Sequence, residues 1–166
     1  MHKQQHYQSA TYTARSSVGY LLKRSHALLR DVSEPALAAR GFTFIQYIIL
    51  VWIRDGIAVN PKDICFEYRH NSGALTRVID QLADRGLLER VRGVEDRRKV
   101  DLRLTSAGRK AVESLIPFMV DTLNTALGDF SGSEVRELVR LLHKFNANLL
   151  PALGSTSGAR ASVTGE

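Results

Sequence analysis

Residues 72–104 constrain the fold of this 166-residue chain more than any other segment, because two hydrophobic periodicities follow each other there. Four apolar residues spaced by three or four positions fall on one face of an α-helix. They are Leu75, Val78, Ile79 and Leu82. In residues 99–104, apolar and charged side chains alternate instead, which is the period of a strand with one buried face. The segment therefore predicts a helix packed on a core, followed by a half-buried strand.

A second strand is predicted between these two elements. Gly86 can end the helix in a left-handed conformation, and residues 88–92 have the composition of a strand. A polar loop over residues 93–98 separates it from the alternating strand 99–104, whose residues Val100, Leu102 and Leu104 are expected to face inward. The two strands form a hairpin, or wing.

A short helix and a turn precede the amphipathic helix. Asn60-Pro61 is typical of a helix start, and Ile64, Cys65 and Tyr68 give that helix an apolar stripe. Residues 69–71 form the turn that leads into the second helix. Helix, turn, second helix and wing together predict a winged helix-turn-helix.

The exposed face of the second helix is suited to DNA. Asn71 or Ser72 can cap the helix, and its first turn is small and polar, so it can approach base edges in a major groove. Arg77 can reach a guanine edge or a phosphate, and Thr76 a base or a backbone oxygen. A solvated polar face is the alternative interpretation of this helix taken alone.

The loop of the predicted wing carries the second half of a DNA-reading surface. Arg97 and Arg98 stand beside Asp96, whose carboxylate can hold the loop in one conformation. A preorganised arginine at a hairpin tip suits the narrow, negative minor groove of A·T-rich DNA. The predicted DNA-binding residues are Arg69, His70, Asn71, Ser72, Gly73, Ala74, Thr76, Arg77, Arg90, Asp96, Arg97, Arg98 and Lys99.

The same residues carry a family resemblance. The stretch over residues 42–109, above all ALTRVIDQLADRGLLER followed by GVEDRRKVDLRLTSAGR, resembles the multiple-antibiotic-resistance regulator (MarR) family of bacterial transcription factors. The helix motif Thr-Arg matches Thr76 and Arg77, and the wing motif Asp-x-Arg matches Asp96 and Arg98. In looser form the resemblance extends over residues 15–150.

The family resemblance implies properties that the residue patterns alone do not. It implies a homodimer on a pseudo-palindromic operator, which represses nearby genes and leaves DNA when a small aromatic or phenolic ligand binds or a cysteine is oxidised. Relatives hold the ligand between their dimer-forming helices and the DNA-binding lobe, where His26, Tyr47 and Trp52 are the candidates in this chain. Each of the three has an alternative interpretation as an ordinary core or boundary residue, which the residue type taken alone favours.

The predicted fold is mainly α with a small β-wing. The winged helix-turn-helix occupies residues 42–105, and helices over residues 11–41 and 106–150 form a dimerisation region. Thr43-x-x-Gln46 and Ser131-x-x-Glu134 are predicted capping boxes, and Pro35 marks a kink or break in a first helix that begins near Ala14. Residues 1–10 are predicted to be flexible and residues 151–166, rich in Gly, Ser, Ala and Thr, to be a disordered tail.

The composition and the absence of other motifs in the sequence argue against other classes of function. A net charge of +6 favours a polyanionic partner, and no apolar run is long enough to span a membrane or resembles a secretion signal, which predicts a cytoplasmic protein. The single cysteine, Cys65, excludes an intrachain disulfide and is expected to be a buried structural thiol without a redox role. The five histidines lack metal-binding spacing, and no phosphate loop or nucleophile motif is present, so neither an enzyme nor a cofactor is predicted.

A winged-helix domain that binds another protein is the competing function. The centre of a protein interface tends to lose charged residues, whereas this wing is rich in them. Its cations are Arg90, Arg92, Arg97, Arg98, Lys99 and Arg103. Charge therefore favours double-stranded DNA as the partner.

Overall fold

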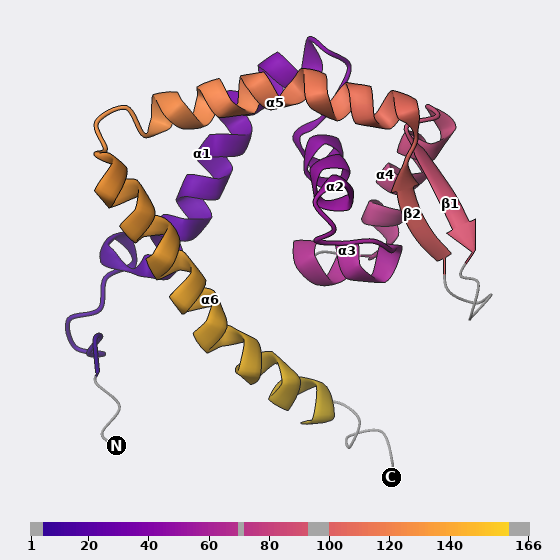
Figure 1. Ribbon diagram of the computed structural model, residues 1–166. Helices are drawn as coiled ribbons and strands as arrows, with labels where there is room; N and C mark the ends of the chain where they lie inside the picture. The colour runs from indigo at the N-terminus through magenta and orange to yellow at the C-terminus, as the bar shows by residue number, and fades with distance from the viewer. Residues whose placement is uncertain (1–4, 70–71, 93–99, 160–166) are drawn as a thin grey trace. The chain divides into compact units, whose positions relative to one another are not determined.

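The computed structural model describes residues 5–69, 72–92 and 100–159 (Figure 1). The elements run in the order η1 (Ala14–Ser16), α1 (Val18–Ala38), α2 (Phe44–Arg54), α3 (Pro61–Tyr68), α4 (Ser72–Asp84), β1 (Leu88–Arg92), β2 (Val100–Leu104), α5 (Ser106–Ala126) and α6 (Gly132–Ala159). The chain divides into two compact units, Met1–Thr122 and Leu123–Glu166. The predicted architecture, mainly helical with a two-stranded wing, is confirmed.

The helix predicted from the apolar spacing is α4, and its inner face is where the pattern placed it. Leu75, Ile79 and Leu82 are buried, and Val78 is half-buried. Gly86 adopts the left-handed conformation with φ of 68°, and the Leu87 N–H donates to the Leu82 carbonyl at 2.9 Å. This is the hydrogen bond that closes a helix end in a Schellman motif.

The start of α2 is held by the capping box that the sequence predicts. The Thr43 hydroxyl accepts a hydrogen bond from the Gln46 N–H at 3.3 Å, and the Gln46 side chain accepts one from the Thr43 N–H at 3.2 Å. Gln46 is buried, and its side chain also bonds Gln81 and Arg85, which fixes α2 against α4 and the turn that follows it. A buried amide with these partners costs little to bury and specifies one packing of the two helices.

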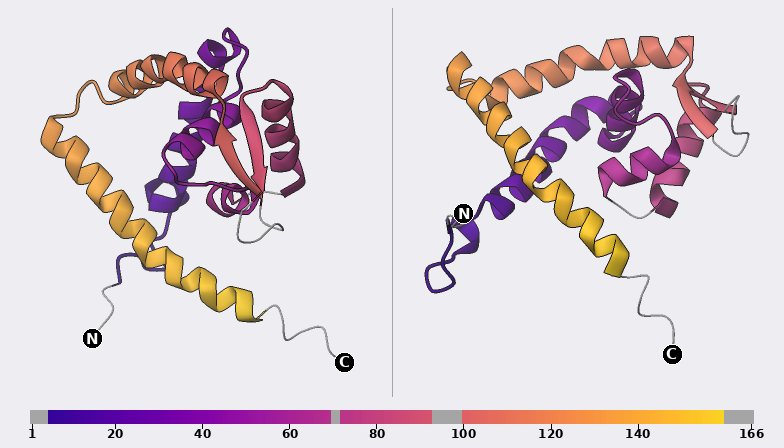
Figure 2. Two further views of the ribbon diagram at one scale, coloured as in Figure 1. Left: turned by 45° about the vertical axis from the view of Figure 1, so that its right-hand side comes forward. Right: turned by 60° about the horizontal axis from the view of Figure 1, so that its bottom comes forward.

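The wing is an antiparallel pair in which Glu89 faces Arg103 and Arg90 faces Leu102. Leu102 and Leu104 are buried, as predicted, while Arg103 is exposed and Asp101 is half-buried. The Leu102 N–H donates to the Val59 carbonyl at 2.7 Å, so the chain between α2 and α3 is tied to β2. In both views of Figure 2 the two strands lie beside α4, in agreement with the contacts between α4 and β1.

One hydrophobic core joins these elements. It takes buried residues from α2, α3, α4, both strands and the first half of α5, among them Ile49, Leu50, Ile64, Leu102 and Val112. Because the inner faces of α3, α4 and the wing share this core, their outer faces are held as one surface.

The first helix begins later than its prediction, and it runs through Pro35 without a break. Ala14–Ser16 form a 3-10 turn, and α1 begins only at Val18, because Ser17 is extended and its side chain caps the helix by accepting from the Tyr20 N–H at 3.2 Å. Pro35 lies inside α1, which continues to Ala38. Ahead of α1, the Tyr7 hydroxyl accepts from the Val18 N–H at 3.0 Å, and residues 1–4 lie outside the described part.

The second unit contains α6, and the tail prediction is wrong for its first nine residues. The Ser131–Glu134 capping box is present, with bonds of 2.8 and 3.3 Å between backbone and side chains. The helix then runs past Pro151 to Ala159, because a helix already formed adds one backbone hydrogen bond for each further residue and Pro151 removes only one donor. Residues 160–166 lie outside the described part.

Candidate nucleic-acid interface

The turn before α4 is set by a left-handed residue. The Asn60 side chain accepts a hydrogen bond from the Asp63 N–H at 2.9 Å and so starts α3 at Pro61, as the sequence predicts. At the other end of α3, Arg69 has φ of 54° and its N–H donates to the Cys65 carbonyl at 3.1 Å. Arg69 therefore ends α3 as a left-handed cap. His70 and Asn71 lie outside the described residues.

The first turns of α4 present a small, polar surface. Gly73, Ala74, Thr76 and Arg77 are exposed, whereas Leu75 between them is buried in the core. The buried residue fixes the rotation of the helix, so the exposed four face solvent together. Small side chains let the helix backbone approach a partner closely, and Arg77 adds a planar donor for base edges or phosphate oxygens. Ser72 is the first residue of α4.

The wing contributes exposed cations beside this face. Arg90, Arg92 and Arg103 are exposed, and the Arg90 guanidinium forms a close ion pair with Asp80 on α4. Because a carboxylate of the helix holds an arginine of the strand, the pair links the recognition surface to the wing. Sequence reasoning missed this pairing, because ten positions of chain separate the two residues and nothing in the local pattern relates them. The other predicted wing residues, Asp96, Arg97, Arg98 and Lys99, lie outside the described residues.

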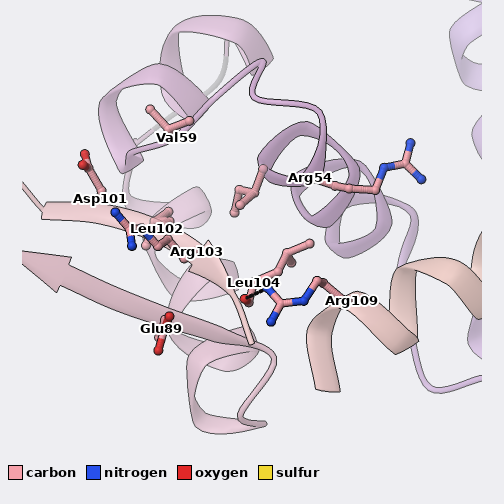
Figure 3. A pocket seen from close by; sticks show the side chains of 9 residues that line it. Arg54, Val59, Glu89, Asp101, Leu102, Arg103, Leu104 and Arg109 are labelled. Carbon is pink, nitrogen blue, oxygen red and sulfur yellow. Dashed lines mark hydrogen bonds between the residues drawn. The ribbon is translucent and has the colours of Figure 1, made fainter. Parts of the chain in front are cut away.

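A pocket of about 570 Å³ runs along β2, next to the C-terminal end of α2 and the start of α5 (Figure 3). Three arginines and two carboxylates line it, together with apolar residues. The charged lining residues are Arg54, Glu89, Asp101, Arg103 and Arg109.

Two of these arginines are engaged locally. Arg54 pairs with Asp55, which lowers the pKa of that carboxyl, and Arg109 donates to the Leu104 carbonyl at 2.8 Å, the dashed line in Figure 3. Because Arg54 and Arg109 already have hydrogen-bond partners, they are poorer candidates for phosphate contacts than Arg77 or Arg92.

A second cavity, of about 630 Å³, brings together two of the three predicted ligand-binding residues. His26 and Trp52 line it, and Tyr47 is not among its lining residues. Tyr47 is half-buried instead, and burial raises the pKa of its phenol. We name this the α1–α3 cavity; its other lining residues, which sequence reasoning did not assign to a ligand, are Arg30, Ile48, Glu67, Tyr68 and Arg69. Their roles depend on how three helices pack, so no local pattern could have revealed them.

Other kinds of site have less support. Within residues 5–69, 72–92 and 100–159, no three His, Cys, Asp or Glu side chains gather in a way that could hold a metal ion. In the same part of the chain, no helix has both the length and the apolar composition needed to cross a bilayer. Cys65, the single cysteine, is a half-buried free thiol on α3.

Comparison with known proteins agrees with this geometry. Residues 40–99, which include α2, α3, α4 and β1, match the family model described as "MarR family". A transcriptional repressor of Bacillus subtilis, YetL, is 24% identical over 116 residues, which cover 69% of this chain and 70% of the repressor.

Two solved structures share the fold over most of their length. Bordetella bronchiseptica BpsR, described with the regulation of its DNA binding by 6-hydroxynicotinic acid, is 28% identical with a TM-score of 0.69, over 81% of this chain and 96% of BpsR. A cysteine mutant of E. coli MarR complexed with operator DNA is 26% identical with a TM-score of 0.66, over 77% of this chain and 92% of the mutant. Each similarity covers more than three quarters of this chain and so extends beyond residues 42–105.

Proposed function

We propose that this chain is a transcriptional regulator of the MarR family, whose model matches residues 40–99, and that it is a repressor that binds a pseudo-palindromic operator as a homodimer. The observation that carries the proposal is the exposed first half of α4, where Gly73, Thr76 and Arg77 face solvent while Leu75 anchors the helix in the core. A helix presented in this way can enter a major groove, with the basic wing beside it. The relative solved with operator DNA supports this assignment.

The DNA-binding surface of the proposal is the set predicted from the sequence. Arg69, Gly73, Ala74, Thr76 and Arg77 supply the α4 side. The wing side consists of Arg90, Asp96, Arg97, Arg98 and Lys99, and the set also includes His70, Asn71 and Ser72. We propose that α4 reads bases, that the wing tip reaches the minor groove, and that the remaining cations contact phosphates.

A second copy of the chain is the proposed partner for the apolar surface that one copy leaves exposed. In the first unit, α1 exposes Val18, Leu21, Leu28 and Val32. In the second unit, α6 exposes six large apolar residues, which are Leu138, Val139, Leu141, Leu149, Leu150 and Leu153. Surfaces of this kind mark association sites, and a two-fold dimer places two recognition helices one helical turn of DNA apart. As a regulator of genes the protein acts in the cytoplasm, without enzymatic activity or a cofactor.

The α1–α3 cavity is the proposed effector site. Its volume of about 630 Å³ lies in the range of small-ligand pockets, and His26, Trp52 and Tyr68 give it aromatic walls. We propose that a small aromatic or phenolic ligand binds there and releases the protein from DNA. BpsR, whose DNA binding is regulated by 6-hydroxynicotinic acid, supports a ligand of this kind.

The proposal is tested by binding to the DNA upstream of the protein's own gene. In a mobility-shift or anisotropy titration, we expect this duplex to bind more tightly than random sequence and the affinity to fall steeply between about 50 and 200 mM salt, because cations of two subunits displace counterions. Size-exclusion chromatography with light scattering should give a dimer. A monomer, or equal affinity for random DNA at low salt, would contradict the proposal and favour a protein-binding winged helix.

The Asp80–Arg90 pair gives a second test. We expect Arg90→Gln to weaken operator binding about three- to tenfold and to reduce the salt slope by about one, because a phosphate contact is lost. Asp80→Asn should not weaken binding, because Arg90 keeps its charge. The free energy of unfolding of both variants should lie within about 1 kcal/mol of the parent's, since the ion pair is exposed. Equal loss of affinity in both variants would mean that Arg90 acts only by positioning the wing.

A further inference from the structure

Gln46 differs from the other buried polar residues in what its side chain binds. Within residues 5–69, 72–92 and 100–159, the buried polar residues are Ser17, Ser33 and Gln46. The hydroxyls of Ser17 and Ser33 donate to carbonyls three and four positions earlier in the chain. The Gln46 side chain instead bonds two residues that lie 35 and 39 positions away. A buried polar side chain with such distant partners specifies how separate elements pack.

The Gln46 amide joins the start of α2 to the end of α4. Its Oε1 accepts from the Thr43 N–H and from Arg85 Nη1, both at 3.2 Å, and its Nε2 donates to Gln81 Oε1 at 3.3 Å. Arg85 also lies over the Phe42 ring, 4.3 Å from the ring centre. One amide thus uses both its oxygen and its nitrogen to hold the C-terminal end of α4 and the residue that follows this helix.

A carboxylate of α1 holds the same start of α2. Glu34, near the end of α1, accepts through Oε2 from the Phe44 N–H at 2.9 Å. The helix dipole favours a negative charge at this end of a helix. Since α2 contacts both α1 and α4, hydrogen bonds run from α1 through the first turn of α2 to the end of α4. We name the four residues that carry these bonds the α1–α4 joint: Glu34, Gln46, Gln81 and Arg85.

The α1–α4 joint adds direction to the packing of the helices. α2 and α4 share the hydrophobic core, through residues such as Ile49 and Ile79. Apolar contact is non-directional, whereas a hydrogen bond requires a defined distance and angle. A small rotation of α4 on the core would therefore keep most of its apolar burial but break the Gln46 hydrogen bonds. Gln46 thus selects one orientation of α4 relative to α2, and Glu34 ties α2 to α1.

We propose that Gln46 is a positioning residue for operator recognition: the α1–α4 joint holds α4 at one orientation to α1, and this orientation sets the half-site spacing that the dimer accepts. Two recognition helices fit successive major grooves only at a defined separation. Gln46 lies on α2 and acts through the end of α4 opposite to Gly73, Thr76 and Arg77. The inference rests on the proposed function for its effect on DNA, but the orientation of α4 can be measured without DNA.

The orientation is tested by pulsed electron paramagnetic resonance on the full chain. Nitroxide labels at Lys23→Cys on α1 and Arg77→Cys on α4, both exposed positions, are introduced in a Cys65→Ser background. An excess of unlabelled chain suppresses distances between copies. We expect a narrow distance distribution for the parent and one about twice as broad for Gln46→Met, which keeps the side-chain length but removes the amide. An unchanged distribution in Gln46→Met would overturn the proposal.

Two further variants separate orientation from stability. Gln81→Met removes one bond of the α1–α4 joint at an exposed position, so it should stay folded and also broaden the distribution. If Gln46→Met does not fold by circular dichroism, an unchanged distribution in Gln81→Met overturns the proposal. Ile49→Val is the matched control, because it shortens a buried side chain of α2 outside the joint. It should lower the urea midpoint of unfolding but leave the distribution narrow. Equal broadening in Ile49→Val would overturn the assignment to Gln46.

The effect on DNA is tested by the ratio of two dissociation constants: for the operator found upstream of the protein's own gene with one base pair inserted at its centre, and for that operator unchanged. We expect a ratio of at least about ten for the parent and below about three for Gln46→Met, because a loosely held α4 accommodates the displaced half-site. Ile49→Val should keep the parent's ratio. A parent-like ratio in Gln46→Met would overturn the link to spacing. If the parent binds no operator, the proposed function fails, while the distance measurements still decide whether Gln46 orients α4.

Discussion

Replacing Gly108 by alanine is expected to lower the free energy of unfolding by about 3 kcal/mol, the upper end for overpacking a core. A Cβ atom at this position would lie 2.1 Å from the Leu87 carbonyl oxygen and 3.3 Å from a Leu104 methyl group. The nearest atom is backbone, so relief requires α5 to move away from the wing. Urea denaturation followed by circular dichroism measures the change.

Gly19→Ala is the matched control for this prediction. Gly19 also lies in a helix, but among the described residues no atom beyond its chain neighbours and the backbone of its own helix lies within 4 Å of a Cβ atom added there. Since alanine is the better helix former, we expect this variant to unfold at the same free energy or up to about 1 kcal/mol higher. A change in the free energy of unfolding for Gly108→Ala as small as that for Gly19→Ala would show that α5 does not pack against Leu87 as closely as the structure has it.

Replacing Arg77 by alanine is expected to weaken operator binding about ten- to a hundredfold, which corresponds to one specific base contact of about 1–3 kcal/mol. Arg77 is exposed on α4, so its truncation should leave stability within about 0.5 kcal/mol of the parent. If Arg77 reads a base, the Arg77→Ala substitution lowers the affinity for random DNA much less than the affinity for the operator. An anisotropy titration of both duplexes at one salt concentration distinguishes the two contributions.

Lys23→Ala is the control for the loss of one positive charge. Lys23 is exposed on α1, outside the proposed DNA-binding surface and on a different side of the helix from Leu21 and Leu28. We expect this variant to change operator affinity by less than about threefold. Equal losses in Lys23→Ala and Arg77→Ala would mean that total charge, and not the face of α4, determines binding.

Sequence patterns predicted most of the elements that build the proposed interface. The spacing of Leu75, Ile79 and Leu82 gave the buried face of α4 correctly, and the alternation after residue 99 gave β2. Capping side chains marked the starts of α2 and α3, because a cap acts within four residues and leaves a local signal. The start of α1 is the exception: Ser17 is also a local capping signal, and the prediction of a helix from near Ala14 overlooked it.

Composition was a poorer guide at the C-terminal end. The residues after Pro151 are small and polar, which favours a disordered tail, yet α6 continues to Ala159. Helix continuation depends on backbone hydrogen bonds already formed upstream, and composition does not report them.

The chain alone determined the periodicities, the caps and the charge, and therefore the winged helix-turn-helix with its exposed Arg77, because each of these acts between residues close in sequence. Tertiary structure alone decided that Arg90 pairs with Asp80, that His26 and Trp52 share a cavity without Tyr47, and that Arg69 borders this cavity in a left-handed conformation. Those relations join side chains of different helices and strands. They depend on how the buried faces pack, and packing is a property of the whole core.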